Sequence, residues 1–570
     1  MTPLDWWVLG GVLGAFVLYG LWRSRGERDL TDYLLAGRSM PWPMVALSVM
    51  ATQASAITFV ATPGQGFADG LRFVQFYLGL PLAMIVLCVT AIPIYRRLGV
   101  FTAYEYLEGR FDGKTRTLAA ALFLLQRGLA AGLGIYAPAL VLSVLLGWDV
   151  RLTCALIGGL AALYTVSGGS RAVSHTQALQ FTVILATMAF VAWRIAAGLP
   201  RGVGWSETVS LAGLSGRLNA LQLHFDPNDR YNLWSGLIGG FFLQLSYFGA
   251  DQSQVGRYLT GRSVAQSRLG LLFNGLVKVP MQFGILSLGV LVFVAYLFSA
   301  SPVWFDPAAS ARLATGPDAQ VYRAIEARHQ ALEVERQGRL AVWLAARHGG
   351  DAAGERAAAE GVLETQRQQA GLRSEVTGLI ERRDPRANKS DVNYVFLTFV
   401  LGHLPIGWIG LVFACVFAAS MNSSSAELNA LTSCTVIDVV KRVRAGPWTP
   451  AAELWVSRLV TFLWTAFAVA FAESASHLGS LIEAVNLLGS LFYGTILGIF
   501  LSAFYLRRIR GTAVFVGALV AEAAVLACFH FTHISFLWYN VVGCLLVPAV
   551  ALLVEALTRA PVGYSGRSLR

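Results

Sequence analysis

A run of four polar residues interrupts an apolar stretch of the chain. Asn422 is followed by three serines within the hydrophobic segment 407–435, and Glu427 comes soon after them. Hydroxyl and carbonyl oxygens are the ligands that hard cations prefer, so Asn422, Ser423 and the next two serines fit a site for an ion such as Na⁺. The alternative is that these hydroxyls donate to carbonyls of their own helix and bind nothing.

Two other apolar segments carry small and polar residues near their centres. Segment 42–63 contains the run Ala51 to Ala56, and segment 233–255 contains Gln244 and Asp251. Helices that unwind inside a membrane free carbonyls for a cation and amides for an anionic solute. The two segments lie five spans apart and therefore cross in opposite directions, as in the inverted repeat of a secondary transporter. Close packing of helices on small residues is the alternative.

The composition indicates that membrane-spanning helices position these residues. Of 570 residues, 55% are hydrophobic and only 14% are charged, whereas a soluble domain has about 25% charged residues. This excludes a set of soluble domains, a disordered chain and a collagen. The six cysteines show no CxxC spacing, so neither a metal site nor a disulfide framework is expected. The chain is expected to be an all-α polytopic membrane protein whose surroundings are the lipid bilayer.

About thirteen segments are long and apolar enough to cross a bilayer, which takes about 20 residues. They are residues 6–23, 42–63, 72–95, 117–147, 152–170, 174–199, 233–255, 270–299, 407–435, 454–474, 482–506, 512–532 and 537–557. The first lacks a basic leader and a cleavage site, which favours a retained span.

The basic residues indicate the orientation of these spans. Loops on one side carry 22 Lys and Arg residues, and short loops on the other side carry five. Cytoplasmic loops are the basic ones, so the N-terminus is expected outside and the C-terminus in the cytoplasm. The net charge of +11 is thereby explained without nucleic-acid binding. The plain topology favours a plasma membrane, specifically a bacterial inner membrane.

A hydrophilic insert divides the membrane part into two stretches, 1–300 and 393–570. The insert, 301–392, holds thirteen basic and thirteen acidic residues. Helix formers dominate 318–348 and 352–383, which predicts a helical hairpin outside the cytoplasm. The apolar piece 393–406 is too short to span and is expected to lie over the outer mouth.

Several stretches resemble the sodium/solute symporter family, which includes sodium–glucose, sodium–proline, sodium–monocarboxylate and multivitamin transporters. The matching stretches are DYLLAGRSMPW at 32–42, GVFTAYEYLEGRF at 99–111, YTVSGGSRAV at 164–173, ADQSQVGRYL at 250–259, and the segment 417–440. The resemblance implies a fold like that of the leucine transporter, with five-plus-five inverted repeats in spans two to eleven. It also implies alternating access driven by sodium.

The same resemblance implies roles for particular residues. The sodium site falls on the carbonyls of Ala51, Ala54 and Ala419 and the hydroxyl of Ser423, with Asn422 where many members have Ser. The substrate pocket falls on Gln53, Thr58, Tyr77, Gln244, Lys278 and Asn486. Tyr247 matches the aromatic gate under the substrate, and Phe248 lies beside it. Na⁺ is the coupling ion, and no organic cofactor is expected.

One departure from the family concerns the sixth span. Many relatives carry an Asp where this chain has Gln177, two residues after His175. Glu427 lies four residues beyond Ser423 and so on nearly the same helix face. We hypothesise that Glu427 replaces the missing carboxylate. A buried Glu and a His also bind protons, so proton coupling is the alternative.

The expected function is sodium-coupled symport of a small organic solute. Lys278 lies inside a span and either attracts a substrate carboxylate or pairs with a neighbouring one. Arg127, also inside a span, favours a gating pair over substrate binding. A sugar or an inorganic anion is an alternative solute. The chain lacks the motifs of common enzymes and the repeats of a channel filter, so neither class is expected. The sequence gives no oligomeric state.

Overall fold

The chain is helical wherever its structure is described. The computed structural model describes residues 1–23, 36–100, 102–167, 170–385, 387–443, 448–475 and 478–558. Within these ranges the strand-like pairing is a single bridge between Met40 and Gly261. Some of the basic residues counted for the orientation, those within 24–35 and 559–570, lie outside the described residues, as do parts of the family stretches at 32–42 and 164–173.

The apolar helices follow the thirteen predicted segments. They are α1 (Pro3–Arg23), α3 (Trp42–Gln53), α4 (Ala56–Asp69), α5 (Leu80–Val89), α6 (Ala91–Leu98), α8 (Gly113–Leu146), α9 (Val150–Ser167), α10 (Ser170–Ala197), α12 (Gly240–Gly249), α13 (Gln252–Tyr258), α14 (Val264–Phe298), α19 (Trp408–Cys434), α21 (Pro450–Ser474), α22 (Leu481–Tyr505), α23 (Gly511–Phe531) and α24 (Phe536–Thr558).

Shorter helices connect or cover them. They are η1 (Ala36–Arg38), η2 (Arg72–Tyr77), α7 (Glu105–Arg110), α11 (Trp205–Leu214), η3 (Ser235–Gly239), α15 (Pro307–Thr315), α16 (Ala319–His348), α17 (Ala352–Arg383), α18 (Val392–His403), η4 (Thr435–Val440) and α20 (Lys441–Val443).

Ten described helices are long and apolar enough to cross a membrane, and the bent pair α3–α4 makes eleven. The two other predicted spans correspond to α9, which runs Val150–Ser167, and to the seventh span, which is interrupted between α12 and α13. The predicted fold class, a polytopic all-α membrane protein, is confirmed.

Local sequence explains where the long central helix α8 begins and ends. Asp112 accepts a hydrogen bond from the backbone of Thr115 at 2.9 Å, which satisfies one of the free amides at a helix start. Gly147 follows the helix at φ 67°, a conformation that favours glycine and ends helices. The 34 residues between these signals reach about 51 Å, well over the thickness of the hydrocarbon core.

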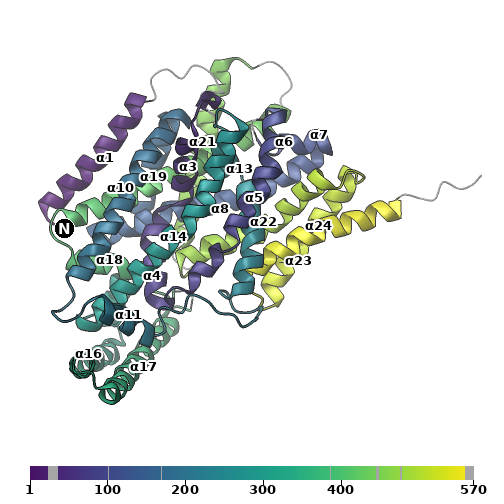
Figure 1. The fold of residues 1–570 in the computed structure, drawn as a ribbon. Coiled ribbons are helices and arrows are strands. Elements are labelled where there is room, and N and C mark those ends of the chain that lie inside the picture. Colours follow the sequence, from purple (N-terminus) through teal and green to yellow (C-terminus); the bar gives the residue numbers. More distant parts are fainter. Residues whose placement is uncertain are drawn as a thin grey trace, which may run out of the picture.

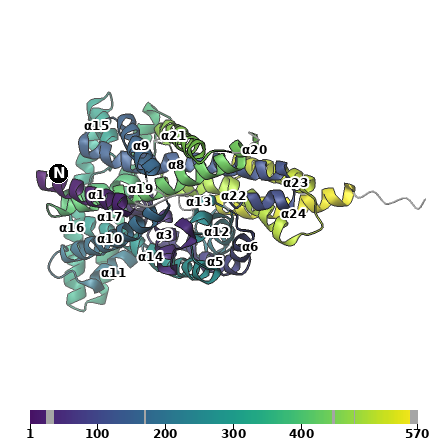
Figure 2. The same cartoon turned by 90° about the horizontal axis from the view of Figure 1, so that it is seen from above.

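The helices surround α8 and α19, and the outer ones lie on opposite sides. Figures 1 and 2 show α1 at one side of the bundle and α23 with α24 at the other. Helix α4 packs tightly on α14 through glycines. A Cβ on Gly66 would lie 2.3 Å from the carbonyl oxygen of Leu286, and one on Gly289 would lie 2.0 Å from that of Pro63. Small residues thus let these backbones approach closely and fix α4 in position.

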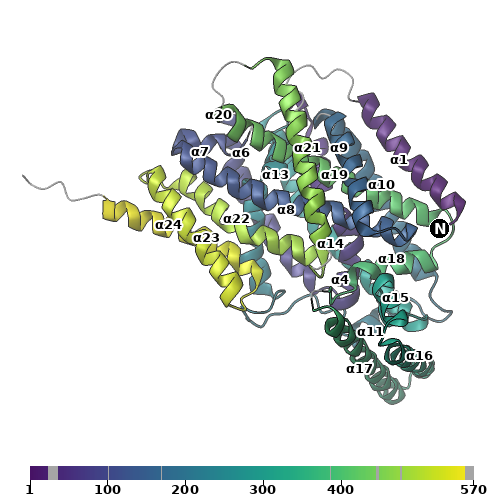
Figure 3. The same cartoon turned by 180° about the vertical axis from the view of Figure 1, so that it is seen from behind.

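The insert forms a hairpin at one end of the bundle. Helices α16 and α17 lie where the helix formers predicted them and pack along each other. Gly350, at φ 71°, makes the turn between them. Figures 1 and 3 show this hairpin projecting at the end of the bundle opposite α6, α7 and α20.

Candidate functional site

The second span breaks in its middle. Helices α3 and α4 meet at 62°, with Ala54 at φ −92°, ψ 78° and Ser55 extended. The amide of Ala54 donates to the carbonyl of Met50 at 2.9 Å. No hydrogen bond among the described residues ends on the carbonyl of Ala51 or Ala54. The break therefore frees backbone oxygens deep inside the protein, as an ion site between half-helices needs.

The seventh span breaks as well. Helix α12 ends at Gly249, and α13 begins two residues after Ala250. Asp251 stands in the break, and its Oδ1 accepts hydrogen bonds from the amide of Ser253 at 2.8 Å and from its hydroxyl at 2.7 Å. The side chain thus caps α13, as an acidic residue does at a helix start. Both interruptions predicted from the sequence are present.

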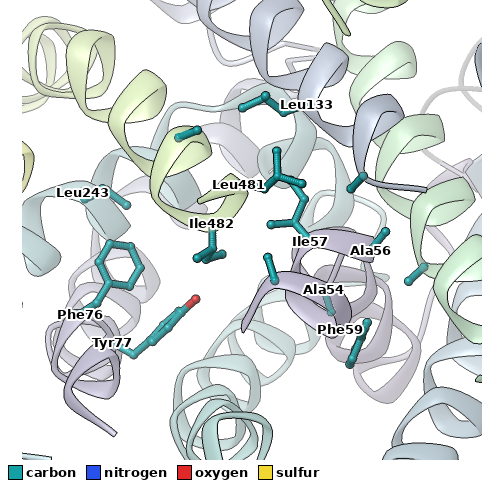
Figure 4. Packing of buried hydrophobic residues seen from close by; sticks show 14 of the residues in the cluster. Ala54, Ala56, Ile57, Phe59, Phe76, Tyr77, Leu133, Leu243, Leu481 and Ile482 are labelled. Atoms are coloured by element: carbon teal, nitrogen blue, oxygen red, sulfur yellow. The ribbon is translucent and has the colours of Figure 1, made fainter. Parts of the chain in front are cut away.

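A small cavity of about 90 Å³ lies at the first break. Eight residues predicted for the site line it: Gln53, Thr58, Tyr77, Gln244, Tyr247, Ser423, Glu427 and Asn486. Figure 4 shows Phe76, Tyr77, Leu243 and Ile482 gathered beside the break at Ala54. A ligand pocket has about 300–1,000 Å³, so the helices must move apart before an organic solute can enter.

The cavity wall offers hydrogen-bond acceptors without partners. The Oε1 atoms of Gln53, Gln126 and Gln244 are buried and accept no hydrogen bond from any described residue. All three side chains line the cavity. Buried polar atoms are normally paired, so three unpaired ones around one cavity indicate a missing ligand.

The predicted sodium residues come from α3, the break and α19. Ser423 lines the cavity together with Thr52 and Ser55 from the broken span. Its hydroxyl lies 3.3 Å from the carbonyl oxygen of Ala419 and 3.2 Å from that of Ser420. This is the bonding to its own helix named above as the alternative, yet the hydroxyl oxygen keeps lone pairs for a cation.

Asn422 and Gln177 are not part of the cavity wall. Both polar atoms of the Asn422 side chain are buried and have no partner in the described part of the chain. Gln177 accepts from the hydroxyl of Ser48 at 2.7 Å and donates to the backbone carbonyl of Asn422 at 3.2 Å. An uncharged amide therefore joins α3, α10 and α19. His175 is half-buried in α10 and is not part of the cavity wall.

A buried charge cluster adjoins the cavity. Arg127 of α8 forms ion pairs with Asp251 and, at 3.1 Å, with Glu427 of α19. Its guanidinium also donates to the hydroxyl of Tyr493 at 2.6 Å, and that hydroxyl donates to Asp251 at 2.8 Å. The Arg127 guanidinium lies 5.4 Å from the ring centre of Tyr247. One cation thus links α8, the break before α13, α19 and α22.

The remaining predicted residues lie beside the cavity. Lys278 is buried in α14, with its Nζ 5.8 Å from the ring centre of Tyr77 and in no described ion pair. Phe248 is fully buried behind Tyr247, with ring centres 5.0 Å apart. The Tyr247 hydroxyl accepts a hydrogen bond from Gln254 at 2.7 Å, which anchors the predicted gate to α13.

Two polar residues of the cavity wall, Gln126 and Tyr493, were not predicted from the sequence. Gln126 precedes Arg127 in an apolar helix, and its polarity was a visible signal. Tyr493 comes seven residues after Asn486 in α22, so the two side chains share one helix face. The link between Tyr493 and Asp251 had no signal in the sequence, because 242 residues separate them.

Comparison with known proteins identifies the family. A model of the sodium:solute symporter family matches residues 33–324. The chain belongs to this family. The match ends within α16, so α17 lies beyond it.

Similar proteins include several sodium-coupled carriers. The human sodium/iodide cotransporter is 32% identical over 49% of this chain and 43% of its own length. Mouse sodium-coupled monocarboxylate transporter 1 is 28% identical over 87% of this chain and 68% of its own length. The sodium/sialic acid symporter of Proteus mirabilis is 24% identical over 95% of this chain and 93% of its own length. The chain thus spans less than half of the human cotransporter and about two thirds of the mouse protein.

A solved structure has the same fold. The substrate-bound, outward-open structure of a Na⁺-coupled sialic acid symporter aligns at a TM-score of 0.75 and 22% identity, covering 98% of this chain and 99% of that one. The predicted family is confirmed, and Na⁺ is the coupling ion of that family. The family and these relatives are transporters.

Proposed function

We propose that this chain couples the inward movement of sodium to uptake of a small solute that carries a carboxylate. The observation that carries the proposal is the cavity at the broken second span. The Ser423 hydroxyl and unpaired amide oxygens line it, next to the break that frees the carbonyls of Ala51 and Ala54. Fixed oxygens without partners suit a dehydrated cation, and side-chain amides suit a polar solute.

The ion is proposed to bind between α3 and α19. Its ligands are the carbonyls of Ala51, Ala54 and Ala419 and the hydroxyl of Ser423, with Asn422 close by. Ala51, Ala54 and Ala419 are almost fully buried, so water competes little for the ion. Because α3 and α19 belong to different halves of the bundle, an ion held by both favours one arrangement of the two.

The solute is proposed to bind next to that ion. Gln53, Thr58, Gln244 and Asn486 supply polar groups, and Tyr77 and Tyr247 form its aromatic sides. Lys278 lies behind Tyr77 and contributes positive charge to the site. The names of two relatives, a monocarboxylate transporter and a sialic acid symporter, support a carboxylate. The sodium/iodide cotransporter makes an inorganic anion the competing choice.

The charge cluster is proposed to couple ion binding to opening. Arg127 holds α8, α19, α22 and the break before α13 together, so the cavity cannot open towards α13 while these ion pairs persist. Glu427 lines the ion-binding region with one oxygen and pairs with Arg127 through the other. An arriving cation therefore competes with Arg127 for the Glu427 carboxylate. Gln177 supports the same region without charge.

The protein is proposed to lie in a plasma membrane, in a bacterium the inner one. The N-terminus and the insert 301–392 are outside, and the C-terminus is in the cytoplasm. The basic residues of α6 and α20 support this orientation, because these helices lie opposite the insert (Figure 3). The stretches 1–300 and 393–570 form one membrane domain, and no enzymatic activity is proposed.

Uptake into proteoliposomes tests the proposal. Purified protein is assayed with labelled monocarboxylates, sialic acid, glucose and iodide, with and without an inward Na⁺ gradient, at clamped voltage and fixed pH. Accumulation of a carboxylate that requires Na⁺ is expected. Accumulation that requires Na⁺ but is confined to glucose or iodide would reject the carboxylate and keep the sodium coupling.

Proton coupling is the second candidate, and Glu427 favours it. One of its oxygens is buried without a partner, beside a cavity that also holds Arg127. Uptake that follows a pH gradient and ignores Na⁺ would replace the sodium proposal. In that case Glu427→Gln is expected to abolish the pH dependence, and His175→Gln is the next variant to measure.

A further inference from the structure

A second and larger cavity lies under the insert, away from the central one. Its volume is about 420 Å³, within the range of pockets that bind organic ligands. The ends of α4 and α14, the loop before η3, and helices α16 and α17 surround it. Along α4, Thr58 of the central cavity and Phe67 of this one are nine residues, or about 14 Å, apart. We refer to this second cavity as the insert pocket.

Four basic side chains line its wall, and three of them are in ion pairs. The four are Arg217, Arg336, Arg373 and Lys389, with Asp391 as the lining carboxylate. Arg336 lies 3.7 Å from Glu333, Lys389 lies 2.5 Å from Glu381, and Arg373 pairs with Asp391. Asp391 is already occupied, because it pairs with Arg373 at 2.6 Å and accepts from the amide of Phe305 at 2.7 Å. Arg217 forms no ion pair with a described carboxylate. One of its terminal nitrogens donates to the carbonyl of Ala68, and its guanidinium lies 4.7 Å from the ring centre of Phe293.

Two buried donors on this wall have no acceptor. Nε of Arg217 and Nε2 of Gln369 make no hydrogen bond with any described residue. The orientation of the Gln369 amide is fixed, because its Oε1 accepts from Arg336 at 2.7 Å. Gln369 is 7% exposed. A buried N–H group without an acceptor is costly, so the pair indicates an absent ligand with acceptor atoms.

The other sides of the insert pocket are aromatic and rigid. Tyr296, Trp304 and Phe305 line it, and the Arg373 guanidinium lies 5.4 Å from the ring centres of both Trp304 and Phe305. Arg336 donates to the carbonyls of Tyr296 and Leu297 at 2.8 and 3.2 Å. These bonds attach α16 to the end of α14, so the pocket keeps its shape without a ligand.

We propose that the insert pocket binds an organic anion, a carboxylate attached to an apolar or aromatic body. The carboxylate accepts from Gln369 and Arg217, and the body packs against Trp304 and Phe305. Charge-assisted hydrogen bonds supply the specificity for the anion, and the aromatic walls bury the body. The site differs from the central cavity in its residues and does not depend on sodium coupling. The anion is either the transported solute or an effector that is not transported.

Calorimetry on the full chain in lipid nanodiscs tests the site. Phenylacetate is the probe, 2-phenylethanol is the neutral comparison, and the buffer contains choline in place of sodium. One phenylacetate is expected to bind per chain, and phenylethanol is expected to bind at least tenfold more weakly. Equal binding of the two compounds, or no binding of phenylacetate, would overturn the proposal.

Two variants localise the binding. Gln369→Glu keeps the acceptor for Arg336 and replaces the free donor with an anion, so a loss of at least tenfold in affinity is expected. Arg217→Gln is expected to lose a similar factor. Arg328→Gln removes the same charge from an exposed position of α16, where Arg328 pairs with Glu375, and is expected to bind normally. Normal binding by a folded Gln369→Glu protein would refute the site even if Arg217→Gln failed to fold.

Transport measurements then separate the two sources of the anion. If the anion is the solute, labelled phenylacetate accumulates in proteoliposomes, and Gln369→Glu raises KM with an unchanged maximal rate. If the anion is an effector, phenylacetate binds but does not accumulate. Both results support the site. Binding that is lost in Gln53→Ala and kept in Gln369→Glu would assign the probe to the central cavity and overturn the proposal.

Discussion

The central cavity and the insert pocket differ in the polar side-chain atoms that they leave unpaired. In the central cavity most of these atoms are acceptors, namely three amide oxygens and a carboxylate oxygen of Glu427, beside one donor, Nε of Arg127. In the insert pocket they include the nitrogen donors of Arg217 and Gln369. Acceptors suit a cation and polar hydrogens, whereas donors suit an anion. The comparison teaches that the two cavities are built for different partners.

The two regions also differ in how they are built. Broken helices form the central cavity, which is small and needs helix movement to open. Continuous helices α14, α16 and α17 form the insert pocket, which is already large enough for a ligand. Broken helices expose backbone groups at a moving junction, and continuous helices hold side chains in place. Broken helices therefore suit a site that couples ion binding to helix movement, and continuous helices suit a binding site that is formed before its ligand arrives.

The largest effect on uptake is expected from Ser423→Ala. Removing this hydroxyl takes one ligand from the proposed ion site, so Na⁺-dependent uptake is expected to fall at least tenfold. Uptake is measured in proteoliposomes with the solute that the assay of labelled compounds identifies. Ser433→Ala is the matched control on the same helix, because the Ser433 hydroxyl donates to the carbonyl of Asn429 at 2.7 Å and lies outside the cavity.

The Ser423→Ala protein also tests the separation of the two cavities. Its binding of phenylacetate in sodium-free buffer is expected to match that of the unchanged protein. Sodium-dependent uptake that survives in Ser423→Ala would remove Ser423 from the ion site.

Arg127→Met is expected to destabilise the folded protein strongly. The change leaves the carboxylates of Asp251 and Glu427 buried without their cation, and breaking a buried pair in this way costs about 3–5 kcal/mol. Thermal unfolding in detergent measures it. The triple variant Arg127→Met, Asp251→Asn, Glu427→Gln removes all three charges and should regain much of the loss. An unchanged Tm for Arg127→Met would show that the charge cluster does not stabilise the folded protein.

Glu427→Gln tests coupling with a smaller structural change. The amide keeps an oxygen for Arg127 and loses the charge that a cation competes for, so we expect the Na⁺ concentration for half-maximal uptake to rise several-fold. Glu473→Gln changes the same residue type at the end of α21, away from the cavity, and should leave uptake unchanged. Unaltered ion dependence in Glu427→Gln would reject its coupling role.

The smallest effect is expected on the pH dependence of the thermal stability of the insert. Burial raises the pKa of Glu333, but hydrogen bonds from His329 and Ser301 outweigh it and hold the pKa below the usual 4.5. A carboxyl with a lowered pKa stabilises the fold above its unfolded pKa, and this contribution is lost as the pH falls through the folded pKa. Glu333→Gln should therefore lower Tm at pH 7, and the difference should shrink as the pH falls below the usual pKa of 4.5 and through the lower folded pKa. A difference independent of pH would exclude this contribution.

The sequence predicted the spans, the breaks in the second and seventh spans, and most of the polar residues that line the central cavity. Polar residues inside apolar segments are costly in lipid, so Gln53, Gln244 and the run starting at Asn422 stood out as functional. Local signals of this kind survive in the sequence because each span has to satisfy the bilayer by itself. The helices of the insert were equally visible, since helix formers and a Gly-Gly turn are local features.

The partners of the charged residues could not be predicted in this way. Arg127 was expected in a gating pair, but nothing in the sequence named Asp251, Glu427 and Tyr493 as its neighbours. The insert pocket was not foreseen at all. Its wall joins Arg217, Trp304 and Gln369, which stand far apart in the sequence among many similar residues.

The amino-acid sequence therefore determined the membrane architecture, the family and the positions of the helix breaks. Each of these follows from hydropathy or from short runs of residues that act locally. The tertiary structure alone decided which polar groups face each other, which cavity carries donors and which carries acceptors. Those properties depend on the packing of helices that are distant in the sequence. The same side chain binds a ligand, forms an ion pair or only supports the fold, because its role depends on which groups packing brings within about 3 Å of it.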